Sequence, residues 1–361
     1  MTDRHSQLDD GTRTLTISSS RPAGHPADSP ALAAGLLHDL ALASFTVGAL
    51  NAAAVHHIAD HLADGPLPVA ELAHRSGTHA PSLQRVLRLL AMHGVFHEDD
   101  AGAFGLTPAA HLLRRDTPGS QHASTLTFTA EFMQRSAGGL AETVRTGAPA
   151  FDAVYGRTFF AHLMSEPAEQ QAFDAGMAAF SGSVDDIVAD SCTLPDSGTV
   201  VDVGGGRGGL LRAVLNRAPG LTGVLFDQPQ VVGEHHLDNE ELAGRWRAEG
   251  GDFFTSVPAG GDLYLLKHVL HDWNDEDCLR ILRAVRAAAP AGARLLVVDA
   301  VLAPGNEPDL GKLVDIVMLA VLRGRERTEA EFGTLLTAAG FRPERVIATK
   351  AFASVVEATA V

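Results

Sequence analysis

A histidine with two acidic residues in reach is the first candidate for chemistry in this chain. His271 follows a strand expected over residues 262–266, Asp299 stands at the end of the next expected strand, and Glu326 precedes a later helix. The carboxyl ends of parallel strands meet at one edge of a sheet, so both carboxylates can reach the imidazole. A carboxylate on one ring nitrogen fixes the tautomer and raises the basicity of the other nitrogen. The pattern therefore predicts a general base.

A glycine-rich loop on the same edge predicts where a second reactant binds. Residues 199–211 read TVVDVGGGRGGLL, a buried strand that passes into glycines and restarts as a helix. Glycines let the backbone bend tightly and let a ligand lie against main-chain N–H groups. Gly204, Gly206 and Gly209 fit the dinucleotide pattern. The same loop with Asp202 before it fits an acidic pattern equally well, so spacing alone leaves two cofactor classes open.

Acidic residues at three successive strand ends favour a cationic adenosine. Asp202 would repel a pyrophosphate but attract the sulfonium and ammonium groups of S-adenosylmethionine. Asp227 ends the second strand, where a ribose hydroxyl pair would lie. Asp252 follows the third strand, and with Phe253 and Phe254 it can bracket an adenine. Together the three acids fit S-adenosylmethionine better than a dinucleotide.

The elements that would hold these residues alternate between strand and helix in the C-terminal half. Strands are expected over 200–203, 223–226, 262–266 and 295–300, and helices after 208, from 229, over 275–289 and over 328–339. The last two strands, 345–348 and 351–357, are close enough to form an antiparallel hairpin. We expect an α/β fold with a doubly wound sheet and helices on both faces.

The N-terminal half has the plan of a winged helix. Helices are expected over 55–62, 69–74 and 81–93, and a hairpin over 95–106. Such units often read DNA. Here the recognition helix carries no dense basic array, the hairpin is acidic, and the formal net charge of −16 repels phosphates. A structural or dimerising role is therefore favoured, and nucleic acid is not an expected partner.

Length and composition describe a soluble protein of two domains. The chain has 361 residues, of which 45% are hydrophobic, enough for two sizeable cores. No uninterrupted apolar stretch is as long as a membrane span. The apolar run 40–50 has polar flanks and predicts a buried helix. The polar N-terminus lacks the apolar core of a signal peptide, so we expect a cytoplasmic protein.

Few residues outside the C-terminal half suggest other chemistry. Cys192 and Cys278 lack the spacing of a metal site and predict two buried thiols. His57 and His61 lie one helical turn apart, which is the spacing of a metal pair, but no third ligand is near them in the sequence. Packed or solvated histidines are therefore favoured there, and no metal site is expected.

The motifs taken together resemble the small-molecule O-methyltransferases that use S-adenosylmethionine, the family of plant caffeate and flavonoid methyltransferases and of bacterial natural-product tailoring enzymes. The resemblance covers the chain from about residue 35 to its end. It is carried by VDVGGGRG from residue 201, FDQP from 226, GDFF from 251, LK from 266, HDW from 271 and GRERT from 324.

This resemblance implies a class I methyltransferase fold with an N-terminal, mostly helical dimerisation domain, and a homodimer. We expect a disordered tail (1–30), a winged-helix-like dimerisation domain (31–120), a helical linker that forms part of the substrate pocket (121–188) and a Rossmann-like cofactor-binding catalytic domain (189–361).

The resemblance also implies roles for individual residues. His271 would be the general base, aligned by Asp299, which is one methylene shorter than the glutamate of many members, and by Glu326. The expected cofactor-binding residues are Asp202, Gly204, Gly205, Gly206, Asp227, Gln228 (commonly leucine in the family), Asp252, Phe253, Lys267 and Ser181. The expected substrate-binding residues are Phe173, Met177, Asp272 and Met318.

The expected reaction is transfer of a methyl group to a phenolic hydroxyl of a small aromatic natural product. A phenol, with a pKa of about 10, gives its proton to an imidazole far more readily than an alcohol does. The activated sulfonium methyl needs an in-line nucleophile and no divalent ion. Two alternatives remain open: a relative that uses the cofactor for hydroxylation, decarboxylation or rearrangement, and a DNA-binding regulator.

Overall fold

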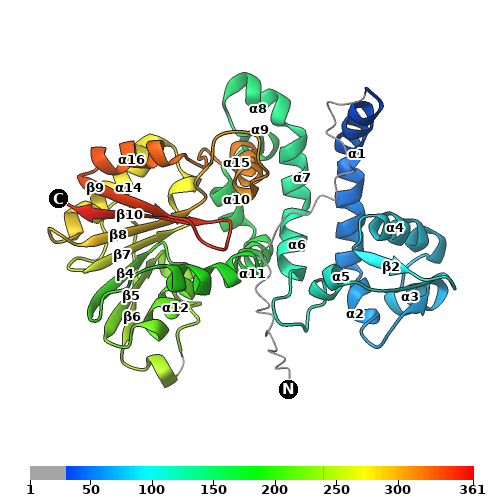
Figure 1. The fold of residues 1–361 in the computed structure, drawn as a ribbon, viewed down its shortest axis with the longest axis horizontal. Helices are drawn as coiled ribbons and strands as arrows, with labels where there is room; N and C mark the ends of the chain where they lie inside the picture. The colour runs from blue at the N-terminus through cyan, green and yellow to red at the C-terminus, as the bar shows by residue number, and fades with distance from the viewer. Residues whose placement is uncertain (1–29, 239) are drawn as a thin grey trace, which may run out of the picture.

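The computed structural model of the chain describes residues 30–361 apart from residue 239. The disordered tail expected over residues 1–30 lies outside this part of the chain, except for its last residue. A large sheet with its helices lies on one side of the molecule, a smaller, mostly helical unit lies on the other, and helices α6, α7 and α11 run between them (Figure 1).

The large sheet has seven strands in the order β6-β5-β4-β7-β8-β10-β9. They are β4 (Gly198–Val203), β5 (Leu221–Asp227), β6 (Trp246–Gly250), β7 (Leu263–Lys267), β8 (Arg294–Asp299), β9 (Phe341–Ile347) and β10 (Ser354–Ala360). Strands β4 to β8 are parallel, and β10 pairs antiparallel with β8 and β9. Five strands therefore end at one edge, and the expected hairpin is confirmed.

Helices cover both faces of this sheet because adjacent residues of each central strand point to opposite sides. Val200 packs into one core with α11 (Pro167–Ser191) and α12 (Gly209–Arg217). Val201 packs into the other core with α14 (Asp275–Ala288) and α16 (Glu329–Ala338). Strands buried on both faces read as continuous apolar runs, which is why the sequence identified them. The doubly wound fold is confirmed.

The short elements around the sheet follow local signals. Asn274 caps α14 by accepting from the Asp277 N–H at 3.0 Å, and Thr328 forms a capping box with Glu331 at the start of α16. The remaining short helices on this side are α13 (Pro229–Val232) and two 3₁₀ helices, Glu240–Leu242 and Leu270–Asp272.

Helix α15 (Leu310–Val321) was not expected from the sequence. Its sequence is rich in valine, isoleucine and leucine, and an apolar run of this kind is compatible with a strand as well as with a helix. The Asp309 side chain caps the helix by accepting from the Gly311 N–H at 2.8 Å.

The N-terminal unit has the expected winged-helix plan with one correction. It comprises α1 (Pro30–Val55), α2 (Ile58–His61), α3 (Val69–Ser76), α4 (Ala80–Met92), α5 (Pro108–Leu112) and a three-stranded sheet of β1 (Leu67–Pro68), β2 (Phe96–Glu98) and β3 (Ala103–Leu106). The helix expected over 55–62 is broken, because His57 adopts the left-handed conformation, with φ of 52°.

The burial expected for the helix at 40–50 is wrong. These residues belong to α1, whose Leu37, Leu40 and Phe45 side chains are 66%, 65% and 69% exposed. The sequence-based expectation about membrane spans concerned uninterrupted apolar stretches. By length and composition alone, the segment Leu32–Val55 is apolar enough to span a membrane, with a mean hydropathy of 1.4, although His38, Asp39 and Asn51 interrupt it. A helix so exposed and apolar needs a covering surface.

Six helices connect the two units and bring aromatic side chains to the edge of the sheet. They are α6 (His122–Phe128), α7 (Glu131–Gly138), α8 (Leu140–Thr146), α9 (Ala150–Tyr155), α10 (Phe159–Ser165) and α11. Phe132, Phe151 and Phe159 pack together with Ala320 and Val321 of α15. This cluster fixes one wall of the cavity described next.

Candidate active site

A cavity of about 710 Å³ lies between the connecting helices and the carboxyl edge of the sheet. Such a volume is in the range of small-molecule sites. The predicted site residues that line it are Ser181, Gly204, Gly205, Gly206, Lys267, His271, Asp272, Phe173, Met177 and Met318. The structure therefore brings together residues that the sequence separates by up to 145 positions, from Phe173 to Met318.

Three other predicted residues lie directly behind this wall. Asp299 and Glu326 are 0% and 2% exposed and face His271 from beneath. Asp202 is buried under the glycine loop, where a Cβ on Gly205 would lie 2.6 Å from its carboxyl carbon.

The remaining predicted cofactor residues do not line the cavity. Asp227 accepts from the Gly206 N–H at 2.8 Å and so holds the loop from behind. Gln228 is exposed, and exposed Asp252 accepts from the Phe254 N–H at 2.9 Å, which closes its own turn. The ring of Phe253 packs edge-on against Phe254.

The glycines bring the backbone itself to the cavity wall. Gly204 and Gly206 have φ of 68° and 57°, a conformation that residues with a Cβ rarely adopt. At Gly205 a Cβ would also lie 2.6 Å from a methyl carbon of Leu225. No larger side chain fits at this position without displacing Asp202 or the strand beside it.

The charge of Asp202 has no partner within the described part of the chain. Both carboxylate oxygens are buried without a hydrogen bond, and burial raises the pKa of this group to about 7. An unpaired buried carboxylate is costly, so a cationic ligand above the loop would be favoured there. The cavity wall also holds an ion pair between Lys267 and Asp185. This arrangement fits the ammonium and sulfonium of S-adenosylmethionine.

The candidate base has one nitrogen fixed and one turned to the cavity. His271 Nδ1 lies 2.7 Å from Glu326 Oε1 and 4.0 Å from Asp299 Oδ1. Its Nε2 lies 3.4 Å from Asp272 Oδ1, on the side that lines the cavity. A Nδ1–H that donates to Glu326 leaves Nε2 as the acceptor.

The carboxylates around His271 set its basicity. Burial alone would lower the pKa of His271, but the charges of Asp272, Asp299 and Glu326 together outweigh burial and raise it to about 10. Burial in turn raises the pKa of Asp272 to about 7 and that of Asp299 to about 6. The imidazole is therefore a strong proton acceptor among acids that share its burial.

The loop that presents Glu326 is held by a residue to which the sequence analysis gave no role. Arg327 is fully buried and donates to the backbone carbonyls of Leu270 and Trp273, both at 2.8 Å. It thereby ties the Glu326 loop to the His271 loop. A Cβ on Gly324 would lie 1.9 Å from the His271 carbonyl oxygen, so the two loops pack backbone to backbone. The signal in the sequence is the GRERT motif, in which Arg327 is the second arginine.

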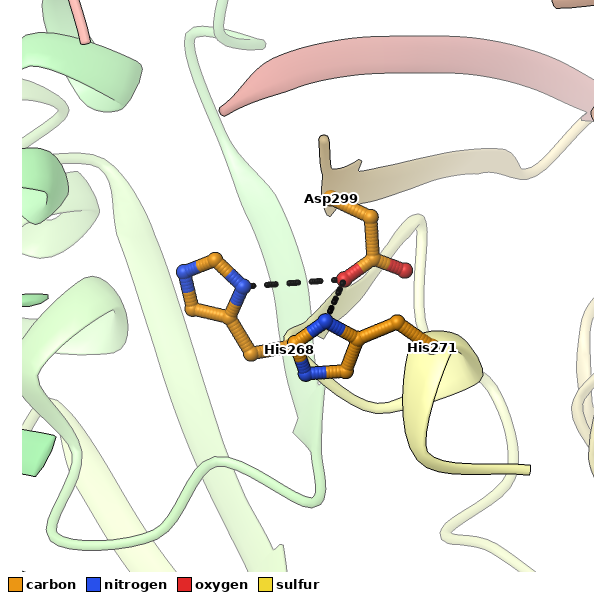
Figure 2. A group of neighbouring side chains, drawn as sticks. All are labelled: His268, His271 and Asp299. Carbon is orange, nitrogen blue, oxygen red and sulfur yellow. Dashed lines mark ion pairs between the residues drawn. The ribbon is translucent and has the colours of Figure 1, made fainter. Parts of the chain in front are cut away.

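His268 is a second imidazole that the sequence analysis did not select. It lines the cavity, and Figure 2 shows its ring and that of His271 turned toward one Asp299 oxygen. His268 Nδ1 lies 3.6 Å from that oxygen, and the centroids of the two imidazoles are 5.2 Å apart. Burial and the neighbouring His271 lower the pKa of His268 well below its usual value, so this ring is neutral.

A large part of the remaining cavity lining is apolar and aromatic. These lining side chains include Phe128, Met133, Phe159, Phe160, Phe180, Val317 and Phe352. Flat rings and flexible methionine side chains suit a planar aromatic ligand.

Two family models match the chain. The O-methyltransferase domain matches residues 138–342, and the O-methyltransferase dimerisation domain matches residues 38–116. The first covers more than half of the chain and includes the glycine loop, His271, Asp299 and Glu326.

Individual proteins resemble the chain over most of its length. Phenazine O-methyltransferase PhzM of Lysobacter antibioticus is 42% identical over 311 residues, which cover 86% of this chain and 91% of that protein. The crystal structure of CalO1, a methyltransferase in calicheamicin biosynthesis in its SAH-bound form, is 41% identical, with a TM-score of 0.84, over 92% of this chain and 99% of that one.

A third relative carries a different activity in its name. Aclacinomycin 10-hydroxylase RdmB of Streptomyces purpurascens is 36% identical over 299 residues, 81% of this chain and 80% of that protein. The overall fold alone therefore does not separate methyl transfer from other chemistry.

Proposed function

Since the chain belongs to the O-methyltransferase family that these matches define, we propose that it transfers the methyl group of S-adenosylmethionine to a phenolic hydroxyl of a small aromatic natural product. The observation that carries this proposal is His271, whose Nδ1 is held by Glu326 at 2.7 Å while the ring lines the cavity. A base oriented in this way is what deprotonation of a phenol needs.

The residues around the glycine loop would hold the cofactor. S-adenosylmethionine supplies an activated methyl group when bound. Gly204–Gly206 would bring the backbone against it, Asp202 would supply the negative charge, and Lys267 and Ser181 line the same part of the cavity. The proposed ribose and adenine residues, Asp227, Gln228, Asp252 and Phe253, lie at the neighbouring strand ends, and their roles follow from the family resemblance.

The base step needs only side chains of this chain. His271 Nε2 would accept the phenol proton while its Nδ1–H keeps donating a hydrogen bond to Glu326. Asp272 and Asp299 would stabilise the resulting imidazolium, since their charges favour its protonated form. The apolar side chains of Phe173, Met177 and Met318 would orient the ring, so that the hydroxyl lies within reach of the base.

The catalytic role of His271 is tested by replacing it with glutamine. His271→Gln keeps a polar side chain but removes the basic nitrogen, so turnover at saturating acceptor should fall by roughly 100-fold or more. Calorimetry should report S-adenosylmethionine binding close to that of the unmodified protein. Turnover near the unmodified level would remove His271 from the base role.

Product analysis separates methyl transfer from the alternative chemistry. The relative named a hydroxylase keeps open a reaction in which the cofactor is retained but no methyl group is transferred. With methyl-labelled cofactor and simple phenols as acceptors, the proposal expects label in the product and one S-adenosylhomocysteine per methylated phenol. Oxygenated or decarboxylated product without label would favour the alternative.

We also propose that the chain works as a soluble, cytoplasmic homodimer that binds no nucleic acid. The match to a dimerisation domain over residues 38–116 includes most of the exposed apolar helix α1, which supports a second copy of the chain as the surface that covers it. The proposed division at residues 31–120, 121–188 and 189–361 assigns this role to the first part, pocket lining to the second and the cofactor to the third.

A further inference from the structure

We propose that His268, His271 and Asp299 also form an inhibitory site for a divalent transition metal such as Zn²⁺. One ring nitrogen from each histidine and one carboxylate oxygen lie within 4.8 Å of one another. Two imidazoles and a carboxylate are a donor set that Zn²⁺, Co²⁺ and Ni²⁺ bind in proteins. The ion would be an inhibitor and not a cofactor.

The distances are close to those of a tetrahedral site. Ligand bonds of about 2.0–2.1 Å place tetrahedral ligand atoms about 3.3 Å apart. Asp299 Oδ1 lies 3.6 Å from His268 Nδ1 and 4.0 Å from His271 Nδ1 (Figure 2). Glu326 Oε1 lies 2.7 Å from His271 Nδ1, near enough to supply a fourth ligand once this hydrogen bond opens. Small side-chain rotations would complete the site.

The donor atoms are buried and short of partners. Within the described residues, both ring nitrogens of His268, both oxygens of Asp299 and Oε2 of Glu326 make no hydrogen bond. A metal ion would satisfy several of these groups at once. The nearby carboxylates of Asp272 and Glu326 add negative charge to the site, which favours binding of a divalent cation.

The backbone of His268 aims its ring at the cluster. His268 is one of two residues other than glycine with a positive φ, 52°, among the described residues. Its N–H is fixed to the Val298 carbonyl at 3.0 Å, beside Asp299 at the end of β8. The ring of Phe352 stacks on it with an interplanar angle of 5°, so its orientation is set from both sides.

A metal on Nδ1 would disable the base without displacing either reactant. A neutral imidazole that binds a metal through Nδ1 carries its remaining proton on Nε2. That nitrogen is the one proposed to accept the phenol proton. The predicted inhibition therefore rests on the proposed function of His271 as the base, whereas the predicted metal binding does not depend on that function.

Metal binding is measured first, on the full chain without cofactor or acceptor. Zn²⁺ is titrated by calorimetry, and Co²⁺ by the visible absorption of a four-coordinate site. We expect one such ion per chain. His268→Asn should weaken binding at least tenfold and abolish the Co²⁺ bands, because asparagine tolerates the left-handed backbone but replaces the ligand. Unchanged affinity and spectrum would overturn the proposal.

A matched control comes from the N-terminal unit. His57 also has φ of 52°, and its Nδ1 lies 3.3 Å from His122 Nε2. Within the described residues, this pair does not belong to any group of three side chains that could hold a metal ion. His57→Asn should leave the Co²⁺ spectrum and the Zn²⁺ affinity unchanged. An equal loss in both variants would mean that the ion binds elsewhere, which also overturns the proposal.

Activity then tests whether the bound ion inhibits. Zn²⁺ should suppress methyl transfer at saturating acceptor, a chelator should restore it, and the calorimetric affinity for S-adenosylmethionine should stay within twofold. His268→Asn should shift the inhibiting Zn²⁺ concentration upward at least tenfold. Full activity with the ion bound would refute the inhibitory site. The proposed function fails by a different result, unlabelled product or a fully active His271→Gln.

Discussion

At the scale of single residues, the base works only if it starts without a proton. A pKa of about 10 for His271, produced by three nearby acids against burial, means that the imidazole holds a proton near neutral pH in the protein without ligands. A positively charged cofactor beside the cluster opposes that protonation, because like charges repel most strongly where water is scarce. Cofactor binding and activation of the base are thus expected to be linked.

The acid limb of the pH profile should depend on Glu326. In Glu326→Gln, one carboxylate that raises the pKa of His271 is gone, so the pKa of His271 falls and the neutral ring appears at lower pH. The rising limb of kcat against pH should move to lower pH by about one unit, and maximal kcat should fall about tenfold because the ring loses its orientation. Initial rates between pH 5 and pH 10 give both values. A limb that moves to higher pH would contradict this electrostatic account.

The charge of Asp202 should lower the free energy of unfolding of the ligand-free protein and strengthen binding of the cofactor. Burial raises its pKa from 3.8 to about 7, so the folded protein holds this proton more tightly than the unfolded chain does. The native state therefore loses stability as the pH rises from about 4 to 7. Asp202→Asn lacks this loss. The unfolding free energy of the variant, relative to that of the unmodified protein, should therefore be more favourable at pH 8 than at pH 4 by about 1–4 kcal/mol.

Calorimetry of the same variant tests the other half of that argument. Without the negative charge under the loop, S-adenosylmethionine should bind at least tenfold more weakly to Asp202→Asn. Denaturant unfolding at pH 4 and pH 8 measures the free energy of unfolding of both proteins. Cofactor affinity that stays the same would separate Asp202 from the cofactor, whatever the stability data show.

At the scale of elements, the catalytic loops depend on Arg327. Arg327→Ala leaves the carbonyls of Leu270 and Trp273 without their buried donor, so the free energy of unfolding should fall by about 2–4 kcal/mol. Turnover should fall at least tenfold, because Glu326 and His271 lose their common anchor. Arg323→Ala is the control: its side chain is 65% exposed and pairs with Asp152, so stability should change by less than about 0.5 kcal/mol.

The elements that the sequence predicted are those whose signals are local. The apolar strands, the helix that begins near Thr328 and the glycine loop are each encoded by a few adjacent residues. The proximity of Asp299 and Glu326 to His271 was also predicted, because strand ends meet at a known edge; the catalytic role of His271 stays a proposal. Helix α15 was missed because its run of valine, isoleucine and leucine is also compatible with a strand. The partnership of His268 with Asp299 was missed because it depends on a positive φ that a histidine seldom adopts.

At the scale of the whole molecule, the open question is what covers α1. Helix α1 lies on the opposite side of the molecule from the C-terminus (Figure 1). A membrane and a second copy of the chain both bury apolar surface, but the dimerisation match and the net charge of −16, which anionic lipids repel, favour the second copy. The correction to the expected burial of residues 40–50 has the same explanation: the burying surface lies outside the single chain.

A charge placed on α1 should therefore dissociate a dimer into monomers. It should not act by releasing a single chain from a membrane. Phe45, 69% exposed, lies in the middle of the apolar stretch, and Phe45→Glu would force a carboxylate into any interface formed there. Light scattering should give a dimer for the unmodified protein and a monomer for this variant. Val361→Glu, at the 60% exposed C-terminal residue, should remain a dimer. A monomeric unmodified protein that sediments with lipid vesicles would instead assign α1 to the membrane.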